Sequence, residues 1–181
     1  MSGVTVHPTA IVDPAAALGP GTVVGPYCIV AAGVSLGENC WLQHHVTLGG
    51  PLRAGRDNKF YAFCSIGQQT QDLKYLGEPT YLEIGDHNCF REFVTINRST
   101  SAAGKTRIGS HGNFLAYSHI GHDCTVGDAV VFSNNGTLAG HVQVGDHAVI
   151  GGTRRCISSA ASGVSRSPAD APRSCRTFRH S

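Results

Sequence analysis

An aliphatic, small or aromatic residue recurs at every sixth position of this 181-residue chain, and this period constrains the fold more than any other feature. An amphipathic helix repeats every 3.6 residues and a half-buried strand every 2, so neither accounts for the spacing. Glycine often follows the periodic residue, as in Leu18-Gly19 and Val126-Gly127, which suits a tight corner. The phase holds at Val6, Val12, Leu18, Val24, Val30, Leu36, Leu42, Leu48, Ala54, Phe60, Ile66, Ile84, Phe90, Ile96, Ile108, Phe114, Ile120, Val126, Phe132, Leu138, Val144 and Ile150.

A fixed internal period of this kind predicts a repeat fold rather than a helical bundle or a sandwich. The pattern resembles that of the hexapeptide-repeat β-helices, in which three six-residue units make one triangular coil. This resemblance implies an all-β chain, a left-handed parallel β-helix that is trimeric in the family, followed here by an irregular C-terminal tail. The left hand comes from the resemblance alone, because parallel crossovers are ordinarily right-handed. Asn and Asp near the expected corners tolerate tight turns.

Two stretches interrupt the period within a repeat domain that we expect to span residues 1–152. The first interruption covers about 67–82 and contains no inward aliphatic ladder, and the second, about 97–106, is rich in Ser and Gly. Loops that leave a solenoid more often carry function than packing. We therefore expect the longer loop to reach over a neighbouring subunit's groove.

Charge and cysteine content narrow the class of protein. Residues 1–152 hold eight Lys or Arg against eleven Asp or Glu, whereas residues 153–181 hold six Arg against one Asp, so the net charge of +2 hides a mildly acidic repeat body. No nucleic-acid partner is expected. The seven cysteines form no CxxC pair and read as small core residues of a reducing compartment. There is no signal peptide and no apolar run long enough to span a membrane, which favours a cytoplasmic protein.

Histidines gather in the most regular part of the repeat. His119 and His122 lie three residues apart, and His141 follows one coil later. A lone histidine on a coil face is usually a solvated residue. However, positions eighteen apart stack on successive coils, so His122 and Gly140 should be neighbours with His141 beside them. This predicts two imidazoles and a backbone amide in one groove, a constellation suited to acid/base chemistry.

Four motifs resemble one hexapeptide family closely. They are Gln71-Asp-Leu-Lys-Tyr75 with Gly77-Glu-Pro-Thr80, Glu92-Phe-Val-Thr-Ile-Asn-Arg98, His119-Ile-Gly-His-Asp-Cys-Thr-Val-Gly127 and Asn134-Asn-Gly-Thr-Leu-Ala-Gly-His141. Together they look like UDP-N-acetylglucosamine O-acyltransferase, the acyl-carrier-protein-dependent enzyme that begins lipid A synthesis. Hexapeptide repeats alone are unspecific, but the first and third motifs together are specific. The resemblance covers residues 5 to about 152.

The resemblance implies a role for each site residue. His122 matches the general base for the sugar 3-hydroxyl, Asp123 the carboxylate that orients it, and Gly140 the backbone N–H that supports the oxyanion. Contacts to substrate are implied for four further residues, Asp72, Lys74, His119 and His141. Asn97 departs from the family, in which many members have His.

The resemblance also implies what accompanies the chain. The acyl donor is a (R)-3-hydroxyacyl group on the phosphopantetheine of acyl carrier protein, and the acceptor is UDP-N-acetylglucosamine. No other cofactor and no metal are expected. The family's sites lie between the subunits of a homotrimer.

Three other functions compete with this interpretation. One is the N-acyltransferase of the same pathway, which shares the solenoid and a histidine base but not the Gln-Asp-Leu-Lys-Tyr loop. Another is a zinc-dependent carbonic anhydrase, with His119, His122 and His141 as ligands. The third is a scaffold without catalysis, which the unusual tail makes worth considering.

The period stops after Gly152, and residues 153–181 are rich in Arg, Ser and Pro. When residues 153–163 are back-translated and read from the third base of each codon, the permitted bases give Ser-Pro-Val-His-Gln-Phe-Cys-Arg-Ile-Gly. This resembles the family's next coil, and residues 176–181 likewise allow Asp-Val-Pro-Pro-Phe. We therefore predict a frameshift near Gly152, a disordered tail and little activity for the chain as written.

Overall fold

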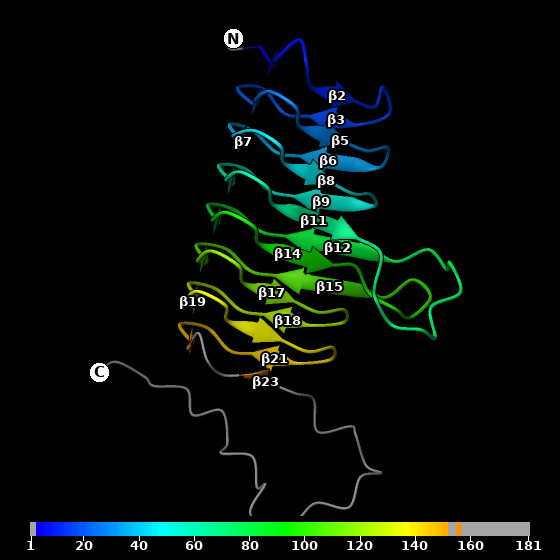
Figure 1. The fold of residues 1–181 in the computed structure, drawn as a ribbon, viewed down its shortest axis with the longest axis vertical. Helices are drawn as coiled ribbons and strands as arrows, with labels where there is room; N and C mark the ends of the chain where they lie inside the picture. The colour runs from blue at the N-terminus through cyan, green and yellow to red at the C-terminus, as the bar shows by residue number, and fades with distance from the viewer. Residues whose placement is uncertain (1–2, 152–154, 157–181) are drawn as a thin grey trace, which may run out of the picture.

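The computed structural model describes residues 3–151 and 155–156, which wind into a solenoid with three faces, each a parallel sheet (Figure 1). The first sheet contains β1 (Thr5–Val6), β4 (Val23–Val24), β7 (Trp41–Leu42), β10 (Lys59–Phe60), β13 (Cys89–Phe90), β16 (Asn113–Phe114), β19 (Val131–Phe132) and β22 (Val149–Ile150). The second contains β2 (Ile11–Val12), β5 (Ile29–Val30), β8 (Thr47–Leu48), β11 (Ser65–Gln68), β14 (Thr95–Asn97), β17 (His119–Ile120), β20 (Thr137–Leu138) and β23 (Arg155–Cys156). The third contains β3 (Ala17–Leu18), β6 (Val34–Leu36), β9 (Leu52–Ala54), β12 (Tyr81–Ile84), β15 (Lys105–Ile108), β18 (Thr125–Val126) and β21 (Gln143–Val144). The described residues include no helix that is long and apolar enough to cross a bilayer.

Strand pairing confirms the predicted coil of three hexapeptides. Val6 pairs with Val24, and Val24 pairs with Leu42, so each residue lies beside the one eighteen positions further on. Successive strands of the chain therefore visit the three sheets in turn, and every coil stacks on the one before it. The fold is the left-handed parallel β-helix that the sequence predicts.

Both loops are insertions of whole repeat units. Ser65 pairs with Thr95 thirty residues on, so this coil holds twelve residues beyond eighteen. Thr95 pairs with His119 twenty-four residues on, so the next coil holds six extra. Because both insertions are multiples of six, the sequence phase survives them. The loops run from 69 to 80 and from 98 to 104, somewhat shorter than predicted, and they protrude from the same edge (Figure 1).

The periodic residues fill the interior as predicted, from Val24 to Ile150. Four phenylalanines stack one above the other, with ring centroids 5.2, 4.9 and 5.0 Å apart along Phe60, Phe90, Phe114 and Phe132. Such contacts bury apolar surface, and this burial stabilises the fold by about 25 cal/mol per Å². Val6, in the first coil, remains 43% exposed because no described coil stacks above it.

The corners require a left-handed backbone conformation in residues that tolerate it. Asn39, Asp123 and His141 have φ of 55°, 58° and 61°. Short polar side chains adopt this region more readily than branched ones. At Gly25 the approach between coils is so close that a Cβ would overlap the carbonyl oxygen of Gln43. Asn, Asp and His therefore occupy many of these corners, although Tyr27, Phe63 and Ala129 adopt the same conformation.

Two buried asparagines satisfy the backbone at one interior corner. Asn88 Nδ2 donates to Asn58 Oδ1 at 3.1 Å and to the carbonyl oxygen of Gly109 at 2.9 Å. Asn88 Oδ1 accepts the Gly112 N–H at 2.7 Å. Asn58 Nδ2 donates to the carbonyl oxygens of Gly55 and Gly85, both at 2.9 Å. The pair therefore replaces water for backbone groups that the short strands leave unpaired.

The described cysteines are free thiols. Cys28, Cys40, Cys64 and Cys124 are buried, and Cys89 is half-buried. Burial raises the pKa of Cys64 to about 12 and that of Cys124 to about 11. These thiols stay protonated near neutrality and act as small core residues, as predicted.

The end of the repeat lies beyond the expected boundary at residue 152 by one strand. β23 pairs with β20, and Cys156 lies beside Leu138 in the register of the repeat. The disorder predicted for residues 153–181 otherwise concerns residues outside those that the structure describes.

We predict that Asn88→Ala lowers the free energy of unfolding by about 2–4 kcal/mol, because the Gly112 N–H and the Gly109 carbonyl oxygen lose a buried partner. The matched control is Asn113→Ala, on the exposed outer side of β16, where the change should stay within about 0.5 kcal/mol. Urea denaturation followed by circular dichroism measures both. Equal effects of the two substitutions would contradict the role of the buried pair.

Candidate functional site

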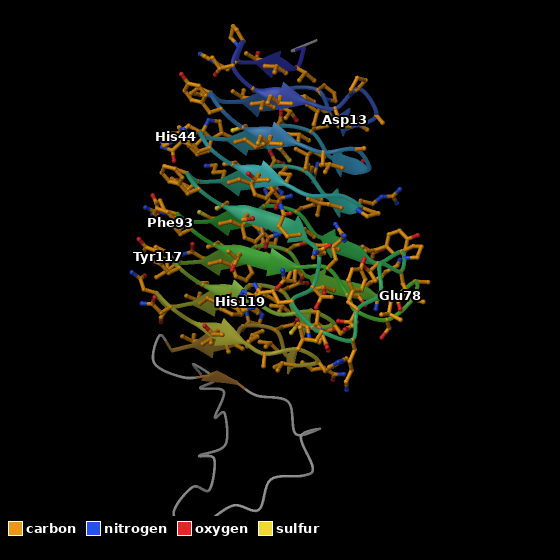
Figure 2. All side chains as sticks on the ribbon, turned by 45° about the vertical axis from the view of Figure 1, so that its right-hand side comes forward. Asp13, His44, Glu78, Phe93, Tyr117 and His119 are labelled. Carbon is orange, nitrogen blue, oxygen red and sulfur yellow. The ribbon has the colours of Figure 1, made fainter. Side chains whose placement is uncertain are left out.

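The predicted histidines lie on the edge of the solenoid from which the two loops protrude. His122 and Asp123 form the corner between β17 and β18, and His141 occupies the same corner one coil later. Figure 2 shows His119 on the sheet beside this edge and Glu78 on the longer loop. The opposite edge carries a ladder of stacked aromatic rings that includes Phe93 and Tyr117, with centroids 4.8 Å apart.

His122 and Asp123 form a hydrogen-bonded pair. The Nδ1 atom of His122 lies 2.8 Å from Oδ2 of Asp123. A carboxylate accepts, so Nδ1 carries the proton, and in this tautomer of a neutral imidazole Nε2 carries the lone pair. The side chains are 17% and 13% exposed, respectively, so both are largely shielded from solvent. The pair therefore has the geometry of an oriented general base.

Several donors keep the Asp123 carboxyl ionised. Burial by itself raises its pKa, but hydrogen bonds from the Ser99 hydroxyl, His122 and the Thr100 N–H outweigh burial and hold the pKa below its ordinary value. The backbone N–H of Asp123 donates to Thr106 Oγ1 at 2.9 Å. Asp123 is thus a fixed anion beside the imidazole.

Gly140 lies directly against the His122 ring, as the eighteen-residue spacing predicts. A Cβ built on Gly140 would stand 2.5 Å from His122 Nε2, so only glycine leaves room for the ring. The Gly140 N–H donates no hydrogen bond to another described residue. An amide at this place can stabilise a negative oxygen that forms beside the imidazole.

His141 completes one wall of the groove. Its ring is perpendicular to that of His122, with centroids 5.0 Å apart, and its Nε2 lies 3.9 Å from Asp123 Oδ2. The side chain is 55% exposed. His141 is therefore open to a ligand in the groove while it contacts the pair.

The longer loop brings one of its two predicted residues to the pair. Asp72 Oδ2 lies 3.9 Å from His122 Nε2. We expect this loop to reach over a neighbouring subunit's groove; within its own chain, Asp72 lies beside His122. Lys74 donates its N–H to Asp72 Oδ1, and its side chain is exposed and makes no ion pair with a described residue. The structure thus brings Asp72 to His122 and leaves the Lys74 ammonium outside the cluster.

His119 lies on the outer side of β17. Its Nδ1 is 2.8 Å from the Thr95 hydroxyl on the neighbouring strand. Burial lowers the pKa of His119 below its ordinary value, and the nearby His122 lowers it further. His119 is therefore neutral near pH 7 and offers a hydrogen-bonding edge rather than a charge.

Three side chains lie close enough together to bind one metal ion. His122, Asp123 and His141 each offer a ligand atom within 4.8 Å of the others, and His119 does not belong to this group. Asp123 Oδ2, however, already accepts hydrogen bonds from His122 Nδ1 and the Thr100 N–H. The carboxylate therefore serves the imidazole, and the ligand set of three histidines considered from the sequence does not form.

Sequence reasoning missed the residues that hold the pair. Ser99 and Thr100 belong to the shorter loop, and Thr106 follows it. Thr70, in the longer loop, accepts hydrogen bonds from Thr100 Oγ1 and from the Asp72 N–H. The sequence shows that these residues are Ser and Thr, but it does not show the coil on which the shorter loop folds back.

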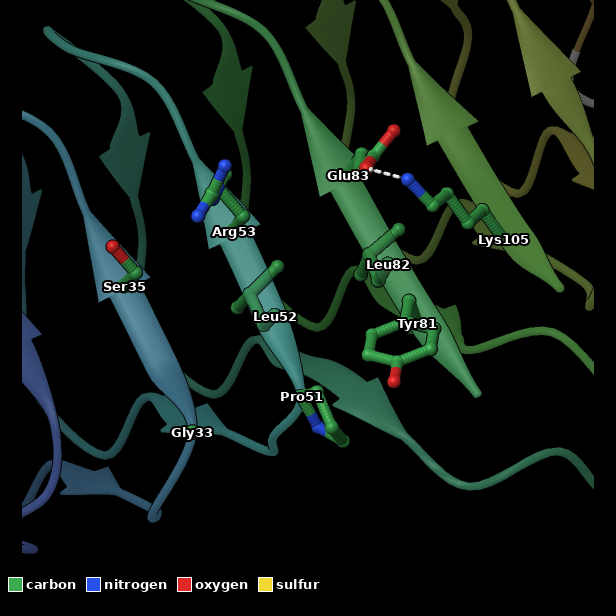
Figure 3. Close-up of a pocket in the computed structure, with 9 residues that line it drawn as sticks. All are labelled: Gly33, Ser35, Pro51, Leu52, Arg53, Tyr81, Leu82, Glu83 and Lys105. Atoms are coloured by element: carbon green, nitrogen blue, oxygen red, sulfur yellow. Dashed lines mark hydrogen bonds and ion pairs between the residues drawn. The ribbon is translucent and has the colours of Figure 1, made fainter. Parts of the chain in front are cut away.

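A separate hollow of about 370 Å³ lies on the third sheet, on β6, β9, β12 and β15 (Figure 3). Arg53, Tyr81 and Lys105 line it, and Glu83 forms ion pairs with Lys105 and Arg107 at its side. None of the site residues lines this hollow.

Comparison with solved structures identifies relatives with the same coil. LpxA of Acinetobacter baumannii is 44% identical with a TM-score of 0.81, over 83% of this chain and 58% of that one. The UDP-N-acetylglucosamine O-acyltransferase (LpxA) of Moraxella catarrhalis is 47% identical with a TM-score of 0.80, over 83% and 59%. The UDP-N-acetylglucosamine acyltransferase of Francisella novicida is 33% identical with a TM-score of 0.81, over 84% and 58%. No protein-family model matches the sequence.

This chain thus spans slightly less than three fifths of the length of these relatives. Within that span the solenoid and the two loops that the motifs predicted are present. The agreement in fold and sequence extends over more than four fifths of this chain. The chain belongs to the UDP-N-acetylglucosamine O-acyltransferase family.

Proposed function

We propose that this chain carries the site of an enzyme that transfers a (R)-3-hydroxyacyl group from acyl carrier protein to the 3-hydroxyl of UDP-N-acetylglucosamine, the first step of lipid A biosynthesis. The observation that carries the proposal is the His122–Asp123 pair, with Nδ1 bound at 2.8 Å and Nε2 left open to the groove beside Gly140. An alcohol attacks a thioester only when a base removes its proton, and this pair supplies that base.

The reaction needs one proton carrier and one oxyanion donor. His122 Nε2 takes the proton from the sugar hydroxyl as its oxygen attacks the thioester carbonyl carbon. The carbonyl oxygen becomes an anion, which the Gly140 N–H stabilises by about 3 kcal/mol. Collapse of this intermediate breaks the carbon–sulfur bond, and the His122 imidazolium returns the proton to the leaving thiolate. Asp123, ionised and buried, stabilises the imidazolium while it exists.

The surrounding polar residues suit the acceptor and the donor. Asp72, 3.9 Å from His122 Nε2, can accept a hydrogen bond from a sugar hydroxyl held at the base. His141 is exposed and can hydrogen-bond to a ligand, and the neutral His119 can bind polar ligand atoms without a charge of its own. Lys74 is exposed and free to meet the phosphopantetheine arm. The donor thus needs no cofactor beyond that arm.

A homotrimer is part of this proposal. Leu73 and Leu76, on the longer loop, are 99% and 87% exposed, whereas a large aliphatic side chain gains about 1.5–3 kcal/mol when buried. Packing of these leucines on a second copy offsets their exposure. It also places the exposed Lys74 between them at the boundary between subunits. We keep the cytoplasm as the compartment, where acyl carrier protein is available.

The competing functions lose support at specific places. An N-acyltransferase of the same pathway does not account for the Gln71–Tyr75 motif, whose Asp72 lies at the base. A zinc enzyme does not account for the two donors on Asp123 Oδ2, nor for His119 outside the cluster. A scaffold without catalysis leaves the buried, ionised carboxylate beside an imidazole without a purpose.

We also propose that residues 153–181 are read in a shifted frame and that the restored frame continues the solenoid. Support comes from the back-translated strings, since two of three bases in each shifted codon are fixed except where they come from Ser or Arg. Sequencing the coding DNA around codon 152 tests this proposal: one restored base should give Pro-Val-His-Gln-Phe and a much longer open frame. A DNA sequence without that frame overturns it, as does acyl transfer at ordinary rates by the 181-residue chain.

In the protein read from the restored frame, His122→Ala should lower the rate of acyl transfer at least about 100-fold, because no other group takes the hydroxyl proton. His44→Ala, at the opposite edge (Figure 2), is the matched control and should leave the rate unchanged. The measurement is release of free thiol from the acyl donor. Near-normal turnover of His122→Ala removes this residue from the mechanism.

Gly140→Ala should lower kcat about 100-fold without unfolding the protein, because the new Cβ displaces the His122 ring by roughly 1 Å. Gly145→Ala is the control, since a Cβ there meets no atom within 4 Å. Steady-state kinetics and the NMR shifts of the His122 ring report on the two variants. An unperturbed ring in Gly140→Ala contradicts the close packing.

A further inference from the structure

The carboxylate of Asp123 is held on both oxygens by the shorter loop. Oδ1 accepts the hydroxyl of Ser99, a residue without solvent exposure. Oδ2 accepts the Thr100 N–H at 3.1 Å and faces His122 Nδ1 at 2.8 Å. Two consecutive residues of one loop therefore bind the two oxygens of one carboxylate.

This arrangement fixes the rotation of the carboxylate. A carboxylate bound on one oxygen alone can turn about its Cβ–Cγ bond, which carries Oδ2 away from the imidazole. With Ser99 on Oδ1 and Thr100 on Oδ2, the carboxylate plane is set and Oδ2 stays opposite Nδ1. Without the Ser99 hydroxyl, Oδ1 would lose its one hydrogen-bond partner among the described residues, on a side chain that is only 13% exposed.

The same loop links the pair to the longer loop. Thr100 Oγ1 lies 3.2 Å from Thr70 Oγ1, and Thr70 Oγ1 also accepts the Asp72 N–H at 3.1 Å. Asp72 is the residue that faces His122 Nε2. A short chain of hydrogen bonds thus connects the two sides of the imidazole through the shorter loop.

We propose that Ser99 is a positioning residue of this site: its buried hydroxyl holds Asp123 in the rotation that keeps the His122 proton on Nδ1 and the lone pair on Nε2. This inference rests on the proposed function for its catalytic consequence, but its geometric content concerns Asp123 and His122 alone. Ser99 touches neither substrate, and it acts through the carboxylate.

The chain offers a closely matched control. Ser101 lies two residues further along the same loop, its side chain is exposed, and its hydroxyl makes no hydrogen bond with a described residue. Ser99→Ala and Ser101→Ala therefore each remove one hydroxyl oxygen from the same loop. Only the Ser99 hydroxyl contacts Asp123. Ser99→Cys keeps a donor of similar size but weaker strength.

The first measurement uses the 181-residue chain and needs no activity. Carbon-13 NMR of the Asp123 carboxyl should show a higher pKa in Ser99→Ala, because a donor to the ionised form is lost while burial remains. The pKa should rise less in Ser99→Cys and stay unchanged in Ser101→Ala. Nitrogen-15 shifts should show that His122 loses its preference for a proton on Nδ1 in Ser99→Ala only. Circular dichroism confirms that each variant is folded.

The second measurement uses the protein from the restored frame. Ser99→Ala should lower kcat about 10-fold with the KM for the sugar nucleotide unchanged, because the base is misaligned while the binding groups remain. An unchanged Asp123 pKa in folded Ser99→Ala overturns the proposal, as does an equal fall in kcat for Ser101→Ala. If the unsubstituted protein transfers no acyl group, the proposed function fails, and the NMR titration still decides the role of Ser99.

Discussion

Stacking of one coil on the next, eighteen residues further along the chain, is the constraint on which the rest of this molecule depends. Each coil has strands of two to four residues, far too short to be stable alone, and gains its partners only from the coils above and below. The interior ladder of phenylalanines and the buried Asn58–Asn88 pair both follow from this repeat. A residue at one position therefore meets its equivalent on the next coil, which turns spacing in sequence into contact in space.

Part of the candidate site follows the eighteen-residue spacing, and part of it comes from the two loops. His122 meets Gly140, and His141 lies beside the His122–Asp123 pair, because these positions are one coil apart. Asp72, Ser99 and Thr100 come from the two loops, which interrupt the repeat by whole units and so leave the core in phase. The regular part provides the coils that carry His122 and Asp123, and the inserted part provides Ser99 and Thr100, which hydrogen-bond to the Asp123 carboxylate. Rigid elements hold catalytic groups more accurately than loops, and here a loop is itself tied to the coils through the Asp123 carboxylate.

The chemistry of the groove follows from desolvation combined with hydrogen bonding. Burial alone would favour a neutral Asp123, yet its donors keep it ionised, and the charge is available to the imidazole. Burial acts without such compensation on His119, whose pKa falls, so this neighbour stays neutral. Hydrogen-bond donors thus offset burial at Asp123, whereas at His119 burial and the nearby His122 both lower the pKa.

The six-residue period by itself determined the coil, the residues that face the interior, the stacking of His122 on Gly140 and the position of both loops. The reason is that only a coil of three hexapeptides buries every periodic aliphatic residue. The motifs added the family and the roles that we propose for His122, Asp123 and Asp72. Only the tertiary structure revealed that Asp72 lies beside His122 of its own chain and that the Lys74 ammonium lies outside the cluster. It also revealed that Ser99 and Thr100 hydrogen-bond to the Asp123 carboxylate. Loop residues have no period to read, and their partners are set by how the chain folds back across coils, which spacing along the sequence does not encode.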